Sequence, residues 1–500
     1  MVDIQVEFYD FSYVRIVCEN SVLFDLKDYF SFFADGYQWN PKFKYGTWSG
    51  KIHLLENTGL LPIGLCPYIA KFAKNMGYSL KIDSSIFEKE DITREQFDQW
   101  VDSKKYFSGE NEISPYWYQK DAVFEAVSKH RALLVLPTSA GKSLIQAMLS
   151  TYYLENYTGK VLILVPTTSL TVQMKQDFID YRLFKEEDIL EIRSGTRRDD
   201  PKAKIYVSTW QTAIKQPAEW FSKFGMLLND ECHKATGPSI STIIKGLTNC
   251  IFKVGLTGTL KDGKANIMQY EGLFGQRFKP TTTKQLMEEG QATNLKINAI
   301  ILNYPELVKQ KIKELNYSDE VKAINGYKKR TMFISNLASK ISKNKDENIF
   351  VMFKFKEHGK ELYEEIKKIH GDKVYLVSGD NSTKDRNILK TALENQNGSI
   401  VVASYGVFST GISIKNLHHV IFAHGVKDKI TVLQSIGRIL RNHSSKDVAT
   451  LWDIIDDAGI RMKKDPSKYK YKNYLLKHAI ERIERYASEN FDYSIKKKDL

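Results

Sequence analysis

The chain has 500 residues, 42% of them hydrophobic, and a formal net charge of +13. This length exceeds what one hydrophobic core usually holds, so it predicts about three domains. No run is long and apolar enough to span a bilayer, and the acidic start argues against a signal or transit peptide, so we expect a cytoplasmic protein with no membrane partner. Four cysteines without metal-ligand spacing argue against a disulfide framework.

Residues 1 to about 95 predict a small α/β module, with β-like runs at 2–8, 13–18 and 52–55 and an amphipathic helix at 69–76. One segment of it holds three lysines and no acid, interleaved with aromatic residues: Trp39, Lys42, Phe43, Lys44, Tyr45, Trp48 and Lys51. Lysines can hold a phosphate backbone while aromatic rings stack on bases, so this segment predicts a DNA contact. The alternative is a hairpin core that uses the same rings.

After a linker expected at 91–107, an apolar run at 132–136 predicts a buried strand. The following loop ends in Gly-Lys-Ser before a second apolar run. Glycine lets backbone N–H groups approach phosphates, lysine adds a positive charge, and a serine at a helix start can hold Mg²⁺. We therefore expect the loop to cradle ATP through Pro137, Thr138, Ser139, Ala140, Gly141, Lys142 and Ser143. The alternative is a plain turn, because Leu136 replaces the first glycine of the phosphate-loop consensus.

Asp230 and Glu231 come directly after a second expected buried strand, residues 220–228. Ligands bind at the carboxyl ends of parallel strands, so both acids should lie beside the phosphate loop. Asp230 would then reach Mg²⁺, and Glu231 would orient and polarise the attacking water. A solvated acidic pair is the alternative.

A hinge is expected at 284–295, followed by a second domain with strands at 349–353, 373–377, 399–403 and 419–423. An amphipathic helix at 474–486 should pack on it. The whole positive excess lies in this part, because residues 296–500 hold 38 Lys+Arg against 25 Asp+Glu. A basic surface would give sequence-independent phosphate affinity. A lysine-rich solvated surface is the alternative, for example at Lys463, Lys464, Lys468, Lys470 and Lys472.

Arg438 and Arg441 stand three residues apart, on one face if the segment is helical. Arginine suits a transition state whose charge spreads over phosphoryl oxygens, so we expect both to reach ATP from the second domain. A solvated helix face is the alternative.

In this order, the motifs resemble those of superfamily 2 nucleic-acid helicases and translocases. The corresponding segments are 141–143 for motif I, 230–233 for motif II, 256–260 for motif III, 402–411 for motif V and 434–441 for motif VI. The resemblance implies an α/β fold of two tandem RecA-like parallel-sheet motor domains, 96–285 and 286–500, preceded by the small α/β DNA-binding domain, 1–95. It also implies an ATP-dependent DNA helicase that uses ATP and Mg²⁺. Two departures are Ser139, where the family usually has glycine, and Leu260, where it usually has proline.

The resemblance assigns roles to further residues. It places Gln119 at the adenine, Gly411 at the nucleotide, and Thr167 and Trp210, in motifs Ia and Ib, at the nucleic-acid backbone. The residues expected to couple ATP hydrolysis to movement are His233, Thr257, Thr259, Gly411 and Gln434.

Over nearly its whole length, including 40–51 and 420–425, the chain resembles the recombination helicases of T4-like bacteriophages. It is also similar to the excision-repair branch of the superfamily. The phage resemblance implies action on branched DNA (Holliday junctions, forks and D-loops) and on RNA–DNA hybrids in R-loops, in recombination, repair and replication, in the host cytoplasm. We expect a monomer that binds branched, duplex and single-stranded DNA, with a single-strand-binding or recombination protein as a candidate partner.

Three alternative functions stay open at this stage. One is an ATP-gated DNA clamp or remodeller, and another is an excision-repair-type translocase without processive unwinding. The third, the motor subunit of a restriction enzyme, lacks support because no nuclease carboxylate cluster follows the motor.

Overall fold

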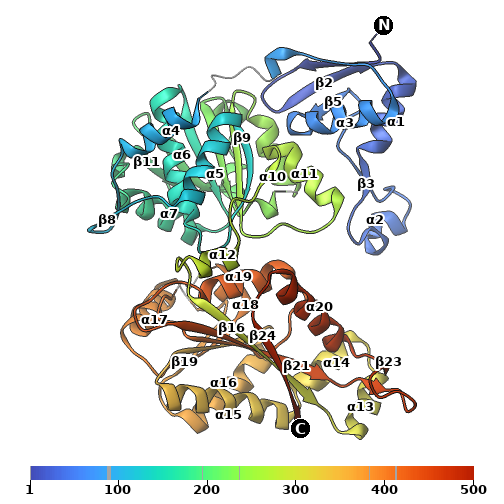
Figure 1. Cartoon of the computed structure of the whole chain (residues 1–500), viewed down its shortest axis with the longest axis vertical. Coiled ribbons are helices and arrows are strands. Elements are labelled where there is room, and N and C mark those ends of the chain that lie inside the picture. The colour runs from blue at the N-terminus through green and yellow to red at the C-terminus, as the bar shows by residue number, and fades with distance from the viewer. Residues whose placement is uncertain (1, 87–91, 194, 236, 382, 411–413) are drawn as a thin grey trace. The chain divides into compact units, whose positions relative to one another are not determined.

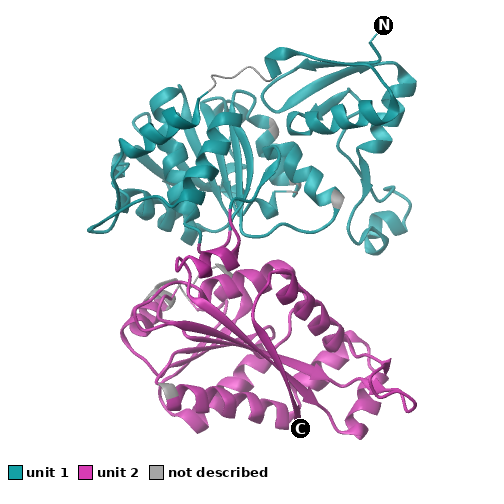
Figure 2. Ribbon diagram, viewed as in Figure 1, with its two compact units in different colours: residues 1–136, 140–280 teal, residues 137–139, 281–500 magenta. Residues whose placement is uncertain are grey.

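The computed structural model describes residues 2–86, 92–193, 195–235, 237–381, 383–410 and 414–500 (Figure 1). The chain forms two compact units, residues 1–136 with 140–280 and residues 137–139 with 281–500 (Figure 2). Each unit contains a seven-stranded sheet, and the expected α/β architecture with two RecA-like domains is confirmed. No helix of the described part is long and apolar enough to cross a membrane.

The N-terminal module of unit 1 is a four-stranded sheet in the order β5-β2-β1-β6. Alternate residues of its two long strands are buried, because one face of the sheet packs against two helices. The strands are β1 (Ile4–Phe8), β2 (Tyr13–Cys18), β5 (Leu60–Pro62) and β6 (Leu80–Ile82), and the helices are α1 (Asn20–Tyr29) and α3 (Cys66–Met76). The runs expected at 2–8, 13–18 and 69–76 are therefore confirmed.

Residues 31–53, here called the tip, project from the sheet and helices of this module (Figure 1). The short strands β3 (Ser31–Phe33) and β4 (Lys51–His53) pair in antiparallel fashion at its base. A 3₁₀ turn at Tyr37–Trp39 and the short helix α2 (Pro41–Lys44) lie between them. Only the first half of the strand expected at 52–55 is therefore extended.

The first motor sheet has the order β11-β12-β10-β13-β14-β9-β15, and every adjacent pair of its strands is parallel. Its strands are β9 (Arg131–Val135), β10 (Lys160–Val165), β11 (Ile189–Ile192), β12 (Ile205–Thr209), β13 (Phe224–Asp230), β14 (Phe252–Thr257) and β15 (Arg277–Phe278). The main helices are α5 (Trp117–Lys129), α6 (Lys142–Asn156), α7 (Thr168–Asp180), α10 (Pro238–Gly246) and α11 (Lys264–Phe274).

Two sequence-based expectations for unit 1 need correction. The strand expected at 220–228 begins only at Phe224, because Ala218–Phe221 form the short helix α9, whose Trp220 and Phe221 pack into the core. The expected linker at 91–107 contains helix α4 (Arg94–Asp102), which starts with a capping box at Thr93. Arg94 of α4 pairs with Asp121 of α5 at 2.6 Å, so this part of the linker packs on the motor domain.

The N-terminal module shares its hydrophobic core with the first motor domain. Met268 of α11 is fully buried in the module's own cluster. A Cβ on Gly64 would lie 2.0 Å from the carbonyl oxygen of Glu271, so the two surfaces touch at backbone level. Lys253 of β14 is buried and donates to the carbonyl of Phe11 at 3.1 Å, and this burial, helped by Arg131, lowers the pKa of Lys253 to about 7. Removing the module would therefore uncover core residues of the motor.

The second sheet has the order β18-β19-β17-β20-β21-β16-β24, and every adjacent pair of its strands is parallel. Its strands are β16 (Asn294–Asn303), β17 (Ile349–Phe353), β18 (Val374–Val377), β19 (Ile400–Ser404), β20 (His419–Phe422), β21 (Val448–Asp457) and β24 (Tyr493–Asp499). Its helices include α12 (Thr283–Glu288), α13 (Glu306–Lys313), α14 (Tyr317–Asn325), α15 (Lys328–Lys345), α16 (Lys356–His370), α17 (Thr383–Asn395), α18 (Tyr405–Thr410), α19 (Lys429–Ile439) and α20 (Tyr474–Ser488). The four expected strands match within one residue at each end, and the expected helix 474–486 is α20.

We predict that Gly64→Ala lowers the free energy of unfolding by about 1–3 kcal/mol, because its Cβ would force the module away from α11. Chemical denaturation of the full chain measures this change. Gly379→Ala is the matched control, since an added Cβ there meets nothing within 4 Å, and it should stay within about 0.5 kcal/mol of the parent. Equal stability of both variants would show that the module does not dock as described.

Candidate functional site

The side chain of Gln119 supports the backbone of the phosphate loop. Gly141 has a φ of +70°, which favours glycine, and helix α6 starts at the next residue, Lys142. A Cβ on Gly141 would lie 2.4 Å from Nε2 of Gln119. The buried Gln119 amide donates to the carbonyl of Ala140 at 3.0 Å and accepts from the N–H of Tyr116 at 2.9 Å. Gln119 thus holds the loop backbone, and its expected contact with adenine stays a prediction.

The two acids stand at the end of β13, beside the loop that leads to α6. Asp230 is the last residue of the strand and Glu231 follows it. Burial, and then the charge of Glu231, raise the pKa of Asp230 to about 7, while the positive charge of Lys142 opposes both effects. Oδ1 of Asp230 is buried and accepts no hydrogen bond from the described residues. A buried carboxylate oxygen of this kind fits a hard cation such as Mg²⁺.

Glu231 is held in an unusual backbone conformation, with φ 49° and ψ 48°. Its carboxylate lies 3.1 Å from Nδ1 of His233. Burial alone would raise its pKa, but the hydrogen bond with His233 and the charge of Lys142 lower the pKa to about 2. Glu231 therefore stays ionised and can accept a hydrogen bond from a water molecule.

A hydroxyl network joins the loop after β13 to the loop after β14. Oγ1 of Thr257 lies 3.0 Å from Nδ1 of His233, 3.3 Å from the Glu231 carboxylate and 3.0 Å from the carbonyl of Thr259. The N–H of Leu136 donates to the carbonyl of Thr257 at 2.9 Å, which ties the network to the end of β9. Three of the expected coupling residues thus lie together with the acid that they would sense.

Sequence reasoning missed one residue of this site, Tyr181. Its hydroxyl lies 2.6 Å from Oγ of Ser143, the expected Mg²⁺ ligand at the start of α6. Burial raises the pKa of Tyr181 well above its usual range, so the phenol stays neutral. No motif marks this position, because Tyr181 follows α7 and reaches Ser143 only through the fold.

Thr167 and Trp210 lie in neighbouring loops at the carboxyl edge of the same sheet. Thr167 follows β10 and precedes α7, and Trp210 starts the short helix α8 (Trp210–Ala213) directly after β12. Because β10 and β12 are adjacent and parallel, the two loops are neighbours. The Trp210 ring is half-buried against the motor core. Their expected contact with the nucleic-acid backbone stays a prediction.

The aromatic residues of the tip differ in how much ring contact they make. Tyr37 stacks on Phe33 with ring centroids 4.5 Å apart and meets Phe43 at 4.8 Å, so these three rings form a small cluster, in which Phe33 is 49% exposed and the other two are half-buried. Trp39 and Tyr45 are 78% and 82% exposed, values that exclude a core role. The alternative of a ring cluster within the hairpin therefore fits Phe33, Tyr37 and Phe43, whereas the DNA contact expected of Trp39 stays a prediction.

The expected lysine contacts of the tip divide in the same way. Lys42 and Lys44 are exposed, and Nζ of Lys44 lies 5.5 Å from the centroid of Trp39. Lys51 instead pairs with Asp28 at 3.5 Å, and its carbonyl accepts from Nε1 of Trp48 at 2.9 Å. Lys51 and Trp48 thus hold the base of the tip, whereas the residues near Trp39 face solvent.

In unit 2, the expectation that Arg438 and Arg441 share one helix face needs correction. Helix α19 ends at Ile439, so Arg438 is helical and Arg441 lies beyond the end. Donors from outside the helix satisfy carbonyls at its end: Lys446 donates to Ile439 at 2.8 Å, and Thr293 donates to Leu440 at 2.9 Å. Gln434 is half-buried on α19, and Gly411 lies outside the described residues.

Side chains from three helices hold the loop between β20 and α19. The carbonyl of Ala423 accepts from Arg330 of α15 at 2.6 Å, that of His424 accepts from Tyr405 of α18 at 2.8 Å, and that of Val426 accepts from Arg482 of α20 at 3.3 Å. This loop leads directly into the helix that carries Gln434 and Arg438. Its backbone position is thus set by the rest of unit 2.

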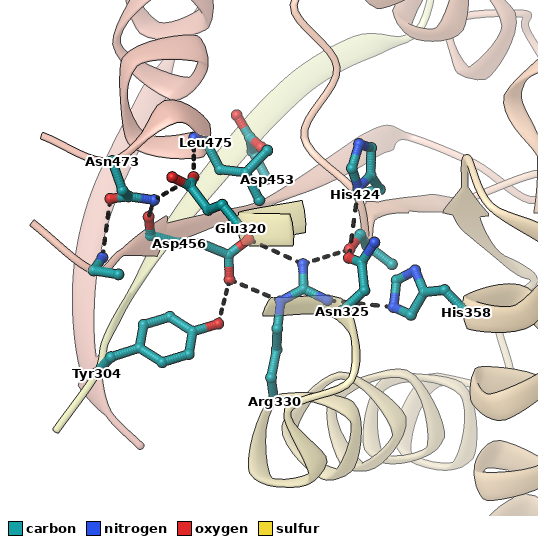
Figure 3. Close-up of polar contacts among 12 residues, drawn as sticks. Tyr304, Glu320, Asn325, Arg330, His358, His424, Asp453, Asp456, Asn473 and Leu475 are labelled. Carbon is teal, nitrogen blue, oxygen red and sulfur yellow. Dashed lines mark hydrogen bonds and ion pairs between the residues drawn. The ribbon is translucent and has the colours of Figure 1, made fainter. Parts of the chain in front are cut away.

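Arg330 and Arg482 are themselves held by buried carboxylates of β21. Nε and Nη2 of Arg330 contact the two oxygens of Asp456 at 2.7 and 3.0 Å, as Figure 3 shows. Arg482 contacts Asp453 in the same bidentate way, at 2.9 and 2.8 Å. His358 lies 3.3 Å from Arg330, and burial lowers its pKa to about 3, so it stays neutral beside the guanidinium. Neither pair was visible in the sequence, because the partners are more than 25 residues apart.

Three family models match successive parts of the chain. They are described as "DNA helicase UvsW, N-terminal" for residues 3–83, "Type III restriction enzyme, res subunit" for residues 112–262, and "Helicase conserved C-terminal domain" for residues 328–443.

Known relatives are similar over most or all of the chain. The ATP-dependent DNA helicase uvsW of Enterobacteria phage T4 is 58% identical over 503 residues, which cover 100% of both chains. The crystal structure of T4 UvsW matches with 56% identity, full coverage of both chains and a TM-score of 0.54. The DNA 3'-5' translocase XPB2 of Sulfurisphaera tokodaii is 26% identical over 65% of this chain and 78% of its own length. The expected resemblance to the recombination helicases of T4-like phages is confirmed.

We predict that Glu231→Gln keeps ATP binding but lowers turnover by at least about a hundredfold, because an amide cannot accept the water's proton. Steady-state hydrolysis and binding of a fluorescent ATP analogue measure the two effects separately. A turnover within about threefold of the parent, well under 1 kcal/mol of barrier, would remove Glu231 from the proposed role.

Tyr405→Phe should lower ATP turnover by about tenfold, because the loop before α19 loses one anchor and small displacements of catalytic groups are costly. The stability cost should be only about 1 kcal/mol for one lost hydrogen bond. Tyr153→Phe is the matched control, since it removes a similar tyrosine-to-carbonyl bond, to Thr158, within unit 1. Equal turnover of both variants would contradict a positioning role for Tyr405.

Proposed function

The chain belongs to the UvsW family of ATP-dependent DNA helicases, and from that premise we propose that it remodels branched DNA. The proposed reactions are branch migration of Holliday junctions, regression of forks, dissociation of D-loops and unwinding of RNA–DNA hybrids in R-loops. The observation that favours branched substrates is the tip, which presents exposed Trp39 and Tyr45 beside Lys42 and Lys44.

In the proposed hydrolysis step, each site residue of unit 1 has its own role. Lys142 supplies positive charge to the phosphates from the start of α6, where backbone N–H groups also point at them. Mg²⁺, held by Ser143 and Asp230, would neutralise charge on the phosphates. The ionised Glu231 orients and polarises the attacking water, and His233 and Thr257 fix the position of its carboxylate.

We assign Arg438 and Arg441 to the phosphoryl group as stabilisers of its developing negative charge. Gln434, on the same helix as Arg438, would report the nucleotide state to unit 2. Cycles of nucleotide binding and release would then alter the two units' affinity for one another and move the motor along the nucleic acid.

The tip is suited to a place where bases are unstacked. Aromatic rings stack on unpaired bases at about 1–3 kcal/mol each, without sequence preference. Lysines next to the rings can hold the phosphates of the same strand. Branch points offer unpaired or strained bases, whereas a plain duplex does not. Thr167 and Trp210 are proposed to hold the tracking strand on unit 1.

The family also suggests an oligomeric state, a location and a partner for this chain. We propose a monomer that acts in the host cytoplasm, where phage DNA is replicated, with a single-strand-binding or recombination protein as a candidate partner. The competing proposal is an ATP-gated clamp or a translocase without processive unwinding, which the same motor residues would serve. Strand separation distinguishes the two, because a clamp hydrolyses ATP without it.

The test compares strand displacement on a four-way junction, a fork, a plain duplex and an R-loop, with ATP turnover followed in parallel. The parent should separate the branched substrates and the R-loop faster than the duplex. Hydrolysis without separation on every substrate would favour the clamp.

Trp39→Ala/Tyr45→Ala should reduce junction processing by at least about tenfold, while ATP turnover stimulated by single-stranded DNA stays within about twofold, because two stacking rings are lost. Phe24→Ala is the matched control, since Phe24 is a 73% exposed ring of α1 in the same module. Unchanged junction processing by the double variant would show that the tip is no DNA contact.

A further inference from the structure

A basic surface forms at the carboxyl edge of the second sheet, outside all the helicase motifs. The register pairs Asn303 at the end of β16 with Asp457 at the end of β21 and with Asp499 at the end of β24. Three strand ends therefore lie side by side, each about 4.8 Å from the next. The segments that follow β16 and β21, and β24 itself, are rich in lysine.

Three lysine-rich segments lead from or run to these strand ends, and together we call them the basic edge. Residues 460–472 hold six basic residues and one acid, residues 306–314 hold three lysines and two acids, and residues 493–500 hold three lysines and one acid. The lysines are Lys309, Lys311, Lys313, Lys463, Lys464, Lys468, Lys470, Lys472, Lys496, Lys497 and Lys498. The sequence alone left open whether one part of this set, the cluster at 463–472, is only a solvated surface.

The middle segment is a built hairpin and not a loose charged run. Strands β22 (Ile460–Arg461) and β23 (Tyr469–Tyr471) pair in antiparallel fashion. Cζ of Arg461 lies 3.4 Å from the centroid of the Tyr469 ring, and the Tyr469 hydroxyl donates to Asp457 at 2.7 Å. Gly459 fits closely, since a Cβ there would lie 2.8 Å from the same ring. The lysines are thus presented from an ordered base.

The charges of the hairpin are directed outward. Lys463, Lys464 and Lys470 are exposed, and none of them makes an ion pair within the part of the chain that the structure describes. Lys468 pairs with Asp465, the one acid of the segment, at 3.4 Å. Three uncompensated positive charges on one hairpin favour a polyanionic partner.

The basic edge lies far from the end of the arginine helix. The hydroxyl of Thr293 donates to the carbonyl of Arg441 at 3.2 Å, and β16 begins at the next residue. That strand runs for ten residues before the basic edge, a length of roughly 30 Å. The lysines therefore cannot reach phosphates that Arg441 contacts.

We propose that the basic edge binds the phosphate backbone of a duplex DNA arm, a site separate from the motor motifs. The proposal rests on the proposed function, in which a branched substrate has arms beyond the tracked strand. Duplex is favoured over single-stranded DNA because the hairpin offers few open ring faces: Arg461 covers Tyr469, and Tyr471 is half-buried. The tip, with its exposed rings, has the opposite character.

The test removes three hairpin charges from the full chain with Lys463→Gln, Lys464→Gln and Lys470→Gln. Anisotropy measures binding of a blunt duplex and of a single-stranded oligonucleotide over a range of salt concentrations. For the duplex, the slope of log K against log salt should become shallower by about 2–3, since each lost phosphate contact reduces the size of the slope by about 0.9. Single-strand affinity and single-strand-stimulated ATP turnover should stay within about twofold.

The matched control removes the same charge from exposed lysines of α16, with Lys360→Gln, Lys367→Gln and Lys368→Gln. An unchanged duplex slope in the hairpin variant, or an equal change in the control, would overturn the local site. An equal loss of single-strand binding would overturn the assignment to a duplex. Loss of polyglutamate binding with duplex binding kept would point to an acidic protein instead. If the proposed helicase function itself were wrong, the parent chain would show no DNA-stimulated ATP turnover, a result that does not depend on the basic edge.

Discussion

The parallel order of the strands is the constraint on which both motor domains depend. Because every adjacent pair in the first sheet is parallel, the loops after β9, β10, β12, β13 and β14 emerge at one edge. Lys142 and Asp230, far apart in the sequence, therefore lie close enough for the charge of Lys142 to oppose the rise in the pKa of Asp230. A site assembled in this way tolerates a missing consensus residue, such as Leu136 in place of glycine, if the loop ends stay fixed.

Buried charge pairs play the corresponding part in unit 2. Asp453 and Asp456 of β21 each hold one buried arginine, and each arginine in turn holds a carbonyl of the loop before α19. Figure 3 shows the pair of Arg330 and Asp456. Such pairs add little net stability, because desolvation of both charges opposes their attraction. Loss of one partner is nevertheless expensive, since the other is left buried and unpaired. The pairs thus fix where the arginine helix begins more than how stable the domain is.

The N-terminal module is part of the first motor domain in physical terms. Its core includes the buried Met268 of α11, and its Phe11 carbonyl accepts from two cations of the motor domain, Lys253 and Arg131. The tip has its own small ring cluster, and it is tied to unit 1 where Asn266 of α11 donates to Asp35 at 2.7 Å. A DNA contact at Trp39 would therefore move with unit 1 whenever the motor changes state.

The sequence by itself determined the fold class, the four strands expected in unit 2 and the motif residues, because strand periodicity and the chemistry of phosphate binding are local properties. It located Lys142, Asp230 and Glu231 without any knowledge of the fold. Only the tertiary structure decided which residues meet across long separations: Tyr181 with Ser143, Gln119 with the phosphate loop, and Arg330 with Asp456. It also ended α19 before Arg441, where Thr293 and Lys446 donate to carbonyls at the helix end, and it left Trp39 exposed beside the clustered rings of Phe33, Tyr37 and Phe43. Such decisions depend on burial and on partners distant in the chain, which no local pattern records.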